Sequence, residues 1–229
     1  MASLPRFSER AIRFLRSLKR NNRRDWFQPR KEEYEQHVRG AMLAIVEQLA
    51  IDLRRVCPEI VVDPKTAIYR IYRDTRFSAN KTPYKTHIAA SFPWRGLPKH
   101  EGAGLYFHVA AEEIWIGGGM YAPQTAQLHA VREHIAANSR RLRSIVDSAA
   151  FRRTFRRLEG EQLQRVPRGF PRDHEAADFL RYRQFLAGRE LGPSFATNAR
   201  FYPTLLETFR TATPLIRFLN EPLTGARRL

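Results

Sequence analysis

The chain has 229 residues, of which 43% are hydrophobic, so it can bury a substantial core, and this composition excludes an intrinsically disordered protein. It contains no apolar run of about 18 residues and no apolar leader segment, so we expect neither a membrane span nor a secretory signal and assign a cytoplasmic location. The single cysteine, Cys57, excludes an internal disulfide and a Cys-based zinc site, and the formal net charge is +17.

The first 58 residues have the pattern of helices. Ser8 is placed to cap a helix that continues to Asn21, with Phe7 and Ile12 as a hydrophobic staple. A longer helix is expected from near Pro29 to Pro58, because its apolar residues recur every three or four positions.

Residues 64–121 have the pattern of a sheet. Alternating or β-rich segments predict four strands, at 66–73, 86–94, 105–109 and 114–116, and their short connections predict mostly antiparallel pairing. If residues 112 and 113 form the loop of the last hairpin, His108 lies opposite Gly117 and Tyr106 lies opposite Gly119. Glycine opposite a polar side chain indicates either open space above that face or a bulge with His108 bonded in the core.

Residues 122–229 are predicted to be mainly helical. Helices are expected after Pro123, after Ser139 and after Ser148, followed by an irregular segment at 162–174. Further helices are predicted at 175–187, 203–211 and 214–219. The order of helices, sheet and helices predicts one α+β domain over residues 1–229, with a mostly antiparallel sheet in the middle of the chain between N-terminal and C-terminal helices.

The segment from residue 70 to residue 85 reads R-I-Y-R-D-T-R-F-S-A-N-K-T-P-Y-K and combines charge with aromatic rings. We call it the basic motif. Its five cations surround one carboxylate, Asp74, and Tyr72, Phe77 and Tyr84 are interleaved with them. This mixture predicts a positively charged, aromatic-walled pocket for an anion. The alternative is a network of structural salt bridges that fixes the loop.

The basic motif resembles the signature of an uncharacterised bacterial family, domain of unknown function 2461. Two further stretches are similar to that family: F-L-x-x-L-x-x-N-N from Phe14 to Asn22, and G-G-G-M-Y-x-P from Gly117 to Pro123. The resemblance extends over most of the chain and implies no established activity. In that family an aspartate often stands where this chain has Asn80, so a scheme with a second carboxylate there does not apply.

Candidate site residues follow from the motif and from the predicted hairpin. The expected ligand-binding residues are Arg70, Arg73, Asp74, Arg76, Phe77, Asn80, Lys81, Tyr84, Lys85, Tyr106, His108 and Trp115. The candidates for proton transfer are Asp74, Tyr84 and His108. The surrounding cations should lower the pKa of Asp74, which suits it to orient a partner rather than to act as a general acid.

The net charge favours a polyanionic partner such as a phosphorylated metabolite or a nucleic acid. The opposing interpretation is compositional, because 34 of the 40 cations are arginine, as a GC-rich coding sequence produces. No motif predicts a metal site or a cofactor, and no feature of the sequence indicates an oligomeric state.

These observations predict a binding protein for an anionic, phosphate-bearing ligand, because no nucleophile and base stand in a recognisable pattern. An enzyme acting on a phosphorylated or other anionic substrate is the first alternative. A nucleic-acid-binding protein is the second.

Overall fold

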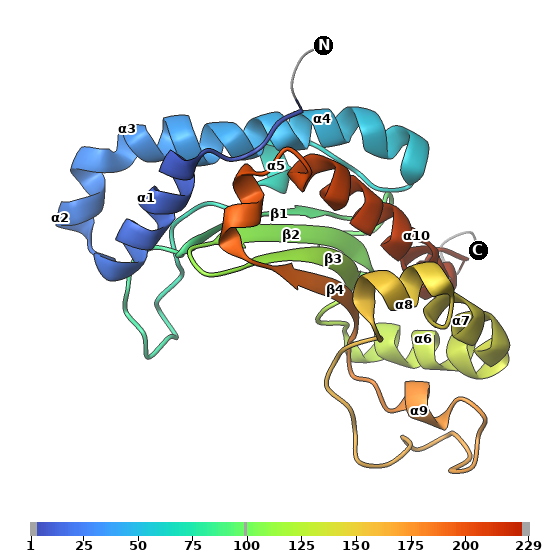
Figure 1. The fold of residues 1–229 in the computed structure, drawn as a ribbon. Coiled ribbons are helices and arrows are strands. Elements are labelled where there is room, and N and C mark those ends of the chain that lie inside the picture. The colour runs from blue at the N-terminus through green and yellow to red at the C-terminus, as the bar shows by residue number, and fades with distance from the viewer. Residues whose placement is uncertain (1–3, 99, 226–229) are drawn as a thin grey trace.

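A four-stranded antiparallel sheet lies in the middle of the chain in the computed structural model, which describes residues 4–98 and 100–225. The strands pair in the order β1-β2-β3-β4. Their bounds are β1 His87–Phe92, β2 Gly104–Ala110, β3 Ile114–Met120 and β4 Phe185–Leu191. Helices precede and follow the sheet, so the protein is a single α+β domain, as the sequence predicts (Figure 1).

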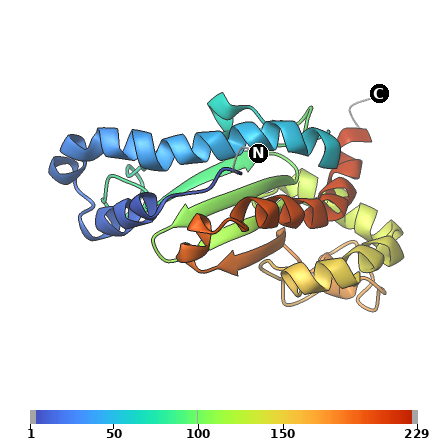
Figure 2. The same cartoon turned by 45° about the horizontal axis from the view of Figure 1, so that its top comes forward.

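One face of this sheet is covered by helices. α10 (Phe201–Gly225) and α4 (Gly40–Val56) lie beside each other above it (Figure 2). Phe209 of α10 contacts Phe92 of β1 and Phe107 of β2, with ring centroids 5.8 and 6.3 Å apart. The hydrophobic core therefore fills the space between the sheet and this helical layer. No helix of residues 4–98 and 100–225 forms such a layer on the opposite face (Figure 1).

The N-terminal helices confirm the predicted pattern. α1 (Glu9–Arg20) begins at Ser8, whose hydroxyl accepts a hydrogen bond from the backbone N–H of Ala11. The long helix predicted from near Pro29 forms as a continuous run of short segments that leads into α4, and the run begins earlier, at Arg24. The segments are α2 Arg24–Phe27, the 3₁₀ turn η1 Gln28–Arg30, α3 Lys31–Glu33 and the π-helical turn η2 Tyr34–Arg39.

The strand predicted at 66–73 does not form as a regular strand. Asp63 caps a short helix, α5 (Pro64–Ala67), by accepting a hydrogen bond from the N–H of Lys65. Proline at the first helical position favours this turn, which takes residues 64–67 out of the sheet. Beyond α5, the segment makes two isolated β-bridges. Ile68 pairs with Ala90 of β1, and Tyr72 pairs with Tyr84, which precedes β1.

The fourth strand instead comes from residues 185–191, where a helix was predicted to extend to 187. Only a short helix, α9 (Ala177–Leu180), forms before β4. The cause is tertiary: β4 pairs with β3 over its whole length, and Gly188 lies directly opposite Gly117. The sheet therefore extends beyond the predicted range of 64–121.

The hairpin between β2 and β3 has a register shifted by two residues from the predicted one. Tyr106 lies opposite Gly117 and His108 lies opposite Trp115. The N–H of Ala110 bonds to the carbonyl of Glu113, so Ala111 and Glu112 form the loop. Because a two-residue shift keeps the same face, Tyr106 and His108 still point away from the core.

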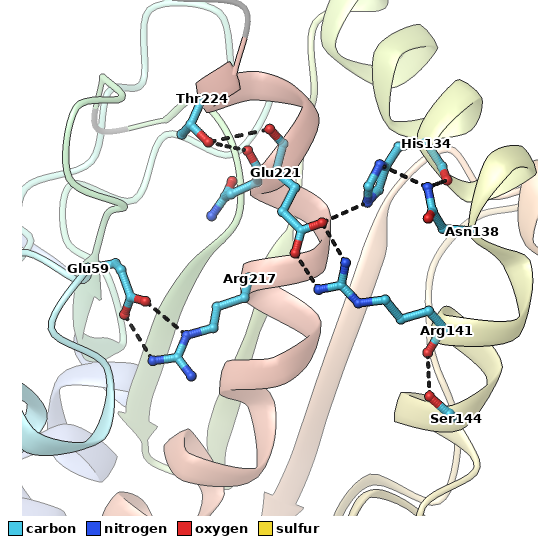
Figure 3. Close-up of polar contacts among 9 residues, drawn as sticks. Glu59, His134, Asn138, Arg141, Ser144, Arg217, Glu221 and Thr224 are labelled. Carbon is cyan, nitrogen blue, oxygen red and sulfur yellow. Dashed lines mark hydrogen bonds and ion pairs between the residues drawn. The ribbon is translucent and has the colours of Figure 1, made fainter. Parts of the chain in front are cut away.

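The C-terminal helices include α10, a single helix where the sequence predicts two, at 203–211 and 214–219. α6 Thr125–Ala137, α7 Ser139–Val146 and α8 Ala149–Phe155 occur near the predicted positions. α10 continues through Pro214, because the core contacts of Leu215, Ile216 and Phe218 outweigh the lost backbone bond. Figure 3 shows that α10 is also fixed by ion pairs to other elements: Arg217 to Glu59 at 2.9 Å, and Glu221 to Arg141.

Candidate functional site

The open face of the sheet carries polar and aromatic side chains. Alternation along the strands points Tyr106, His108 and Trp115 to this face, since Phe107 between them contacts α10. Ring centroids of Tyr106 and Trp115 lie 5.8 Å apart, and those of Tyr106 and Tyr69 lie 6.5 Å apart. Tyr69 is placed beside the sheet by the bond from its N–H to the carbonyl of Ala89.

A cavity of about 690 Å³ lies above this face, and we call it the sheet pocket. Its walls come from the open sheet face, from Tyr69, from the connection between β1 and β2, and from residues beyond β3 and α8. The polar and aromatic lining residues include Tyr69, Ser91, His100, Glu101, Tyr106, His108, Trp115, Tyr121 and Glu159. This volume lies within the range of pockets that hold small organic ligands.

Glycines make room for the indole of Trp115 on the floor of the sheet pocket. A Cβ atom added at Gly188 would lie 2.0 Å from Cζ2 of Trp115, and one added at Gly117 would lie 2.8 Å from Cη2. The indole therefore rests against the backbone of two adjacent strands. Any side chain at either position would displace it, which explains why the sheet has glycine at this pair.

A hydrogen-bonded chain of three side chains runs along the edge of the sheet pocket. The hydroxyl of Tyr106 lies 3.2 Å from Nδ1 of His108, and Nε2 of His108 lies 3.3 Å from a carboxylate oxygen of Glu113. Burial lowers the pKa of His108, although the contact with Glu113 acts in the opposite direction. A carboxylate only accepts, so neutral His108 carries its proton on Nε2 and accepts the Tyr106 hydroxyl at Nδ1.

This arrangement leaves the oxygen of Tyr106 as an acceptor toward the sheet pocket. Burial also raises the pKa of Tyr106, so the phenol keeps its proton. The Glu113 side chain is 46% exposed, compared with 16% for His108, so the chain of contacts leads from a buried hydroxyl to a solvated carboxylate.

His87 adds a second imidazole beside this chain. Its ring centroid lies 5.3 Å from that of His108. Burial, followed by the nearby His108 and Lys85, lowers the pKa of His87 to about 4. His87 is therefore uncharged at neutral pH and contributes a neutral donor and acceptor.

The basic motif forms a loop whose polar groups bond mainly to one another. We call residues 74–82 the motif loop; it is the teal segment that extends away from the sheet in Figure 1. The guanidinium of Arg73 donates to the hydroxyl of Thr82 at 2.5 Å and to that of Ser78 at 3.3 Å. Asn80 accepts hydrogen bonds from the N–H and the hydroxyl of Thr82, at 2.9 and 2.8 Å.

Charged groups at the ends of the motif loop are paired in the same way. Arg76 donates to both carboxylate oxygens of Asp74, at 3.1 and 2.8 Å, and this hydrogen bonding lowers the pKa of Asp74. Nζ of Lys81 donates to the carbonyl of Thr75 at 3.0 Å. These contacts favour the structural alternative for much of the basic motif.

Tyr84 lies in the core and not on a cleft. It is 1% exposed, and its ring centroid lies 4.2 Å from that of Phe27. The side chain of Asn22 bonds both to the N–H of Tyr84, at 3.0 Å, and to its carbonyl, at 2.8 Å. Composition predicts that four side chains converge on one cleft, those of Arg70, Arg76, Lys81 and Tyr84. Because Tyr84 is buried in the core, the four do not converge.

Lys85 and Tyr69 connect the basic motif with the sheet pocket. Nζ of Lys85 lies 5.1 Å from the centroid of the Tyr69 ring, and that ring lines the sheet pocket. Of the predicted ligand-binding residues, Tyr106, His108 and Trp115 line this pocket directly. Sequence reasoning missed Tyr69, His87, His100 and Tyr121 as parts of this region. Alternation in β1 could have indicated His87, but nothing local to the sequence places His100 or Tyr121 there.

Two further observations concern metal sites and membrane spans among the described residues. Among residues 4–98 and 100–225, no group of three or more His, Cys, Asp or Glu side chains is arranged to hold a metal ion. In the same part of the chain, no helix combines the length and the apolar character required to cross a membrane.

The comparisons with known proteins give one match. No curated protein and no solved structure is significantly similar to the chain. Residues 10–218 match the family described as "Conserved hypothetical protein (DUF2461)". This match covers most of the sequence, the sheet, the basic motif and the sheet pocket included, and the chain belongs to that family.

Proposed function

We propose that the protein binds a small phosphate-bearing ligand whose planar ring occupies the sheet pocket. The observation that carries the proposal is the contact of Lys85 with Tyr69, because it places a cation at the wall of an aromatic cavity. A ring can pack against the aromatic walls, while its phosphate meets the ammonium of Lys85 at the edge.

The remaining polar groups of the sheet pocket suit a ring that carries hydrogen-bond donors. The oxygen of Tyr106 is an acceptor, and the acidic residues Glu101 and Glu159 line the cavity. A free inorganic anion would meet these acidic groups without a compensating cation among the lining residues. The combination of ring donors with a phosphate is typical of nucleotides, which we propose as the ligand class.

Isothermal titration calorimetry with a nucleoside monophosphate, the corresponding nucleoside and inorganic phosphate tests this proposal. Replacing Lys85 with methionine should weaken binding of the monophosphate about tenfold or more, since it removes a charge-assisted contact. Binding of the nucleoside should not change.

Lys31→Met is the matched control, because it removes the same charge from an exposed position on α3. It should leave both affinities unchanged. Absence of binding of all three compounds, or an equal loss in the control variant, would contradict the proposal.

An enzyme acting on the same ligand class is the second candidate, and the Tyr106, His108 and Glu113 chain favours it. A proton taken up at Nδ1 of His108 would be stabilised by the carboxylate of Glu113. Phosphorus NMR of a phosphate monoester incubated with the protein tests this candidate. A product that forms with the wild type, but not with His108→Gln or Glu113→Gln, would support it. No reaction at any pH between 5 and 9 would contradict it.

A further inference from the structure

The tip of the motif loop exposes a large aromatic side chain. Phe77 is 96% exposed, and the other exposed large hydrophobic residues of the described chain reach at most 75%, at Tyr121. A phenylalanine in water forgoes the stabilisation that burial of its ring would contribute. Phe77 is also absent from the lining of the sheet pocket, so the proposed ligand site does not account for it.

The motif loop presents this ring on a preformed backbone. Its hydrogen bonds run from Arg73 to Thr82 and Ser78, and from Lys81 to the carbonyl of Thr75. Thr82 is additionally held by Asn80. Because the loop satisfies its own polar groups, little conformational entropy is lost when Phe77 meets a partner.

A cation lies beside the exposed ring. The guanidinium of Arg76 lies 5.7 Å from the centroid of Phe77. The basic motif as a whole contributes five cations against the one carboxylate of Asp74, in a chain with a formal net charge of +17. Both members of an arginine and phenylalanine pair can stack on a nucleobase, and the cations can contact phosphates.

We propose that the motif loop binds single-stranded nucleic acid, with Phe77 stacking on an unpaired base and the neighbouring cations contacting the backbone. Single strands fit better than duplexes, since a stacked and paired base offers no free face to Phe77. An anionic membrane fits less well, because Phe77 is flanked in the loop by polar side chains that bond within it, such as Ser78 and Asn80. Insertion of this one ring into a bilayer would contribute little binding free energy.

Fluorescence anisotropy with a labelled 20-nucleotide oligothymidine tests the proposal. Wild-type protein should bind at low salt, and the affinity should fall steeply as salt is added. Phe77→Ala should weaken binding about tenfold or more, because stacking of one base is lost, and Phe77→Trp should restore it. Neither change should alter the melting temperature, since the side chain touches mostly solvent.

Ile51→Ala is the matched control, because Ile51 is an exposed apolar residue on α4, 58% exposed and outside the loop. It should leave oligonucleotide affinity unchanged. A second control uses phosphatidylserine vesicles in a co-sedimentation assay with the wild type and Phe77→Ala.

Each other outcome would overturn the proposal. Absence of oligonucleotide binding at low salt would exclude the partner, and equal binding by the wild type and Phe77→Ala would exclude the stacking role. Vesicle binding that requires Phe77, together with oligonucleotide binding that does not, would assign the loop to a membrane surface. Loss of nucleotide binding in the sheet pocket would not affect this result, because the two sites share no stacking residue.

Discussion

The motif loop and the sheet pocket differ in how their residues are brought together. The loop is one continuous segment of nine residues, 74–82, and most of its polar contacts join residues less than ten positions apart. The pocket collects residues from all four strands, together with Tyr69 and loop residues as far along the chain as Glu159. A dense local pattern of charge therefore predicts a loop that is held by its own hydrogen bonds, whereas a ligand cavity depends on contacts between residues that are distant in the sequence.

Burial distinguishes two tyrosines of the basic motif. Tyr84 is 1% exposed and packs on Phe27, whereas its bridge partner Tyr72 is 42% exposed. Replacing Tyr84 with alanine should lower the free energy of unfolding by about 3–5 kcal/mol, as for other large core residues. Tyr72→Ala should lower the free energy of unfolding by about 1 kcal/mol or less, because its side chain is exposed. Urea denaturation measures both, and a loss of equal size in the two variants would contradict the placement of Tyr84 in the core.

The floor of the sheet pocket should not tolerate a side chain at Gly117. An added Cβ would lie 2.2 Å from the carbonyl oxygen of Ala187 and 2.6 Å from Cα of Gly188, and neither backbone atom can move freely. Gly117→Ala should therefore lower the free energy of unfolding by about 3 kcal/mol. Gly192→Ala is the control, since no described heavy atom outside Gly192 and its two chain neighbours lies within 4 Å of its Cβ position. Equal stability of the two variants would show that the floor is not packed as described.

His87, which lies beside His108, should also make stability depend on pH. Its pKa in the folded protein is about 4, below the ordinary value of 6.5, so the unfolded chain binds more protons between these values. The free energy of unfolding should be constant above pH 6.5 as far as His87 is concerned, and it should fall as the pH decreases toward 4.

His108, Lys85 and Glu113 are the charged or titratable groups that act on His87. His87→Gln should remove most of this decrease, whereas His129→Gln, at an exposed residue of α6, should not. Urea denaturation at a series of pH values measures the difference. The same pH dependence in His87→Gln and the wild type would contradict the assignment.

The smallest expected effect concerns Ser91. Its hydroxyl is buried at the wall of the sheet pocket and has no hydrogen-bond partner in the part of the chain that the structure describes. Ser91→Ala should raise the free energy of unfolding by about 1 kcal/mol, because it removes an unsatisfied polar group. Thermal melting without ligand measures the change. A clear decrease in stability would show that the hydroxyl has a partner in solution.

The elements that follow from local pattern were predictable from the sequence. Ser8 and the apolar stripe behind it define α1, and alternation defines β2 and β3 closely enough to place Tyr106 and His108 on the outer face. The α+β class and the family could also be inferred, the latter from the basic motif and the G-G-G-M-Y-x-P stretch.

The elements set by tertiary contacts were not predictable in the same way. β4 is a strand because β3 offers it an edge, although its own sequence also fits the end of a helix. The run through Pro214 is helical because its neighbours are buried. For the same reason the walls of the sheet pocket were missed, since His100 and Tyr121 reach it only through the folded chain.

The most direct test of the division between loop and pocket is a crystal structure of the protein soaked with a nucleoside monophosphate. The account predicts density in the sheet pocket, with the ring among Tyr69, Tyr106 and Trp115 and the phosphate beside Lys85. Density for the ligand on the motif loop beside Arg76, with the sheet pocket empty, would contradict it.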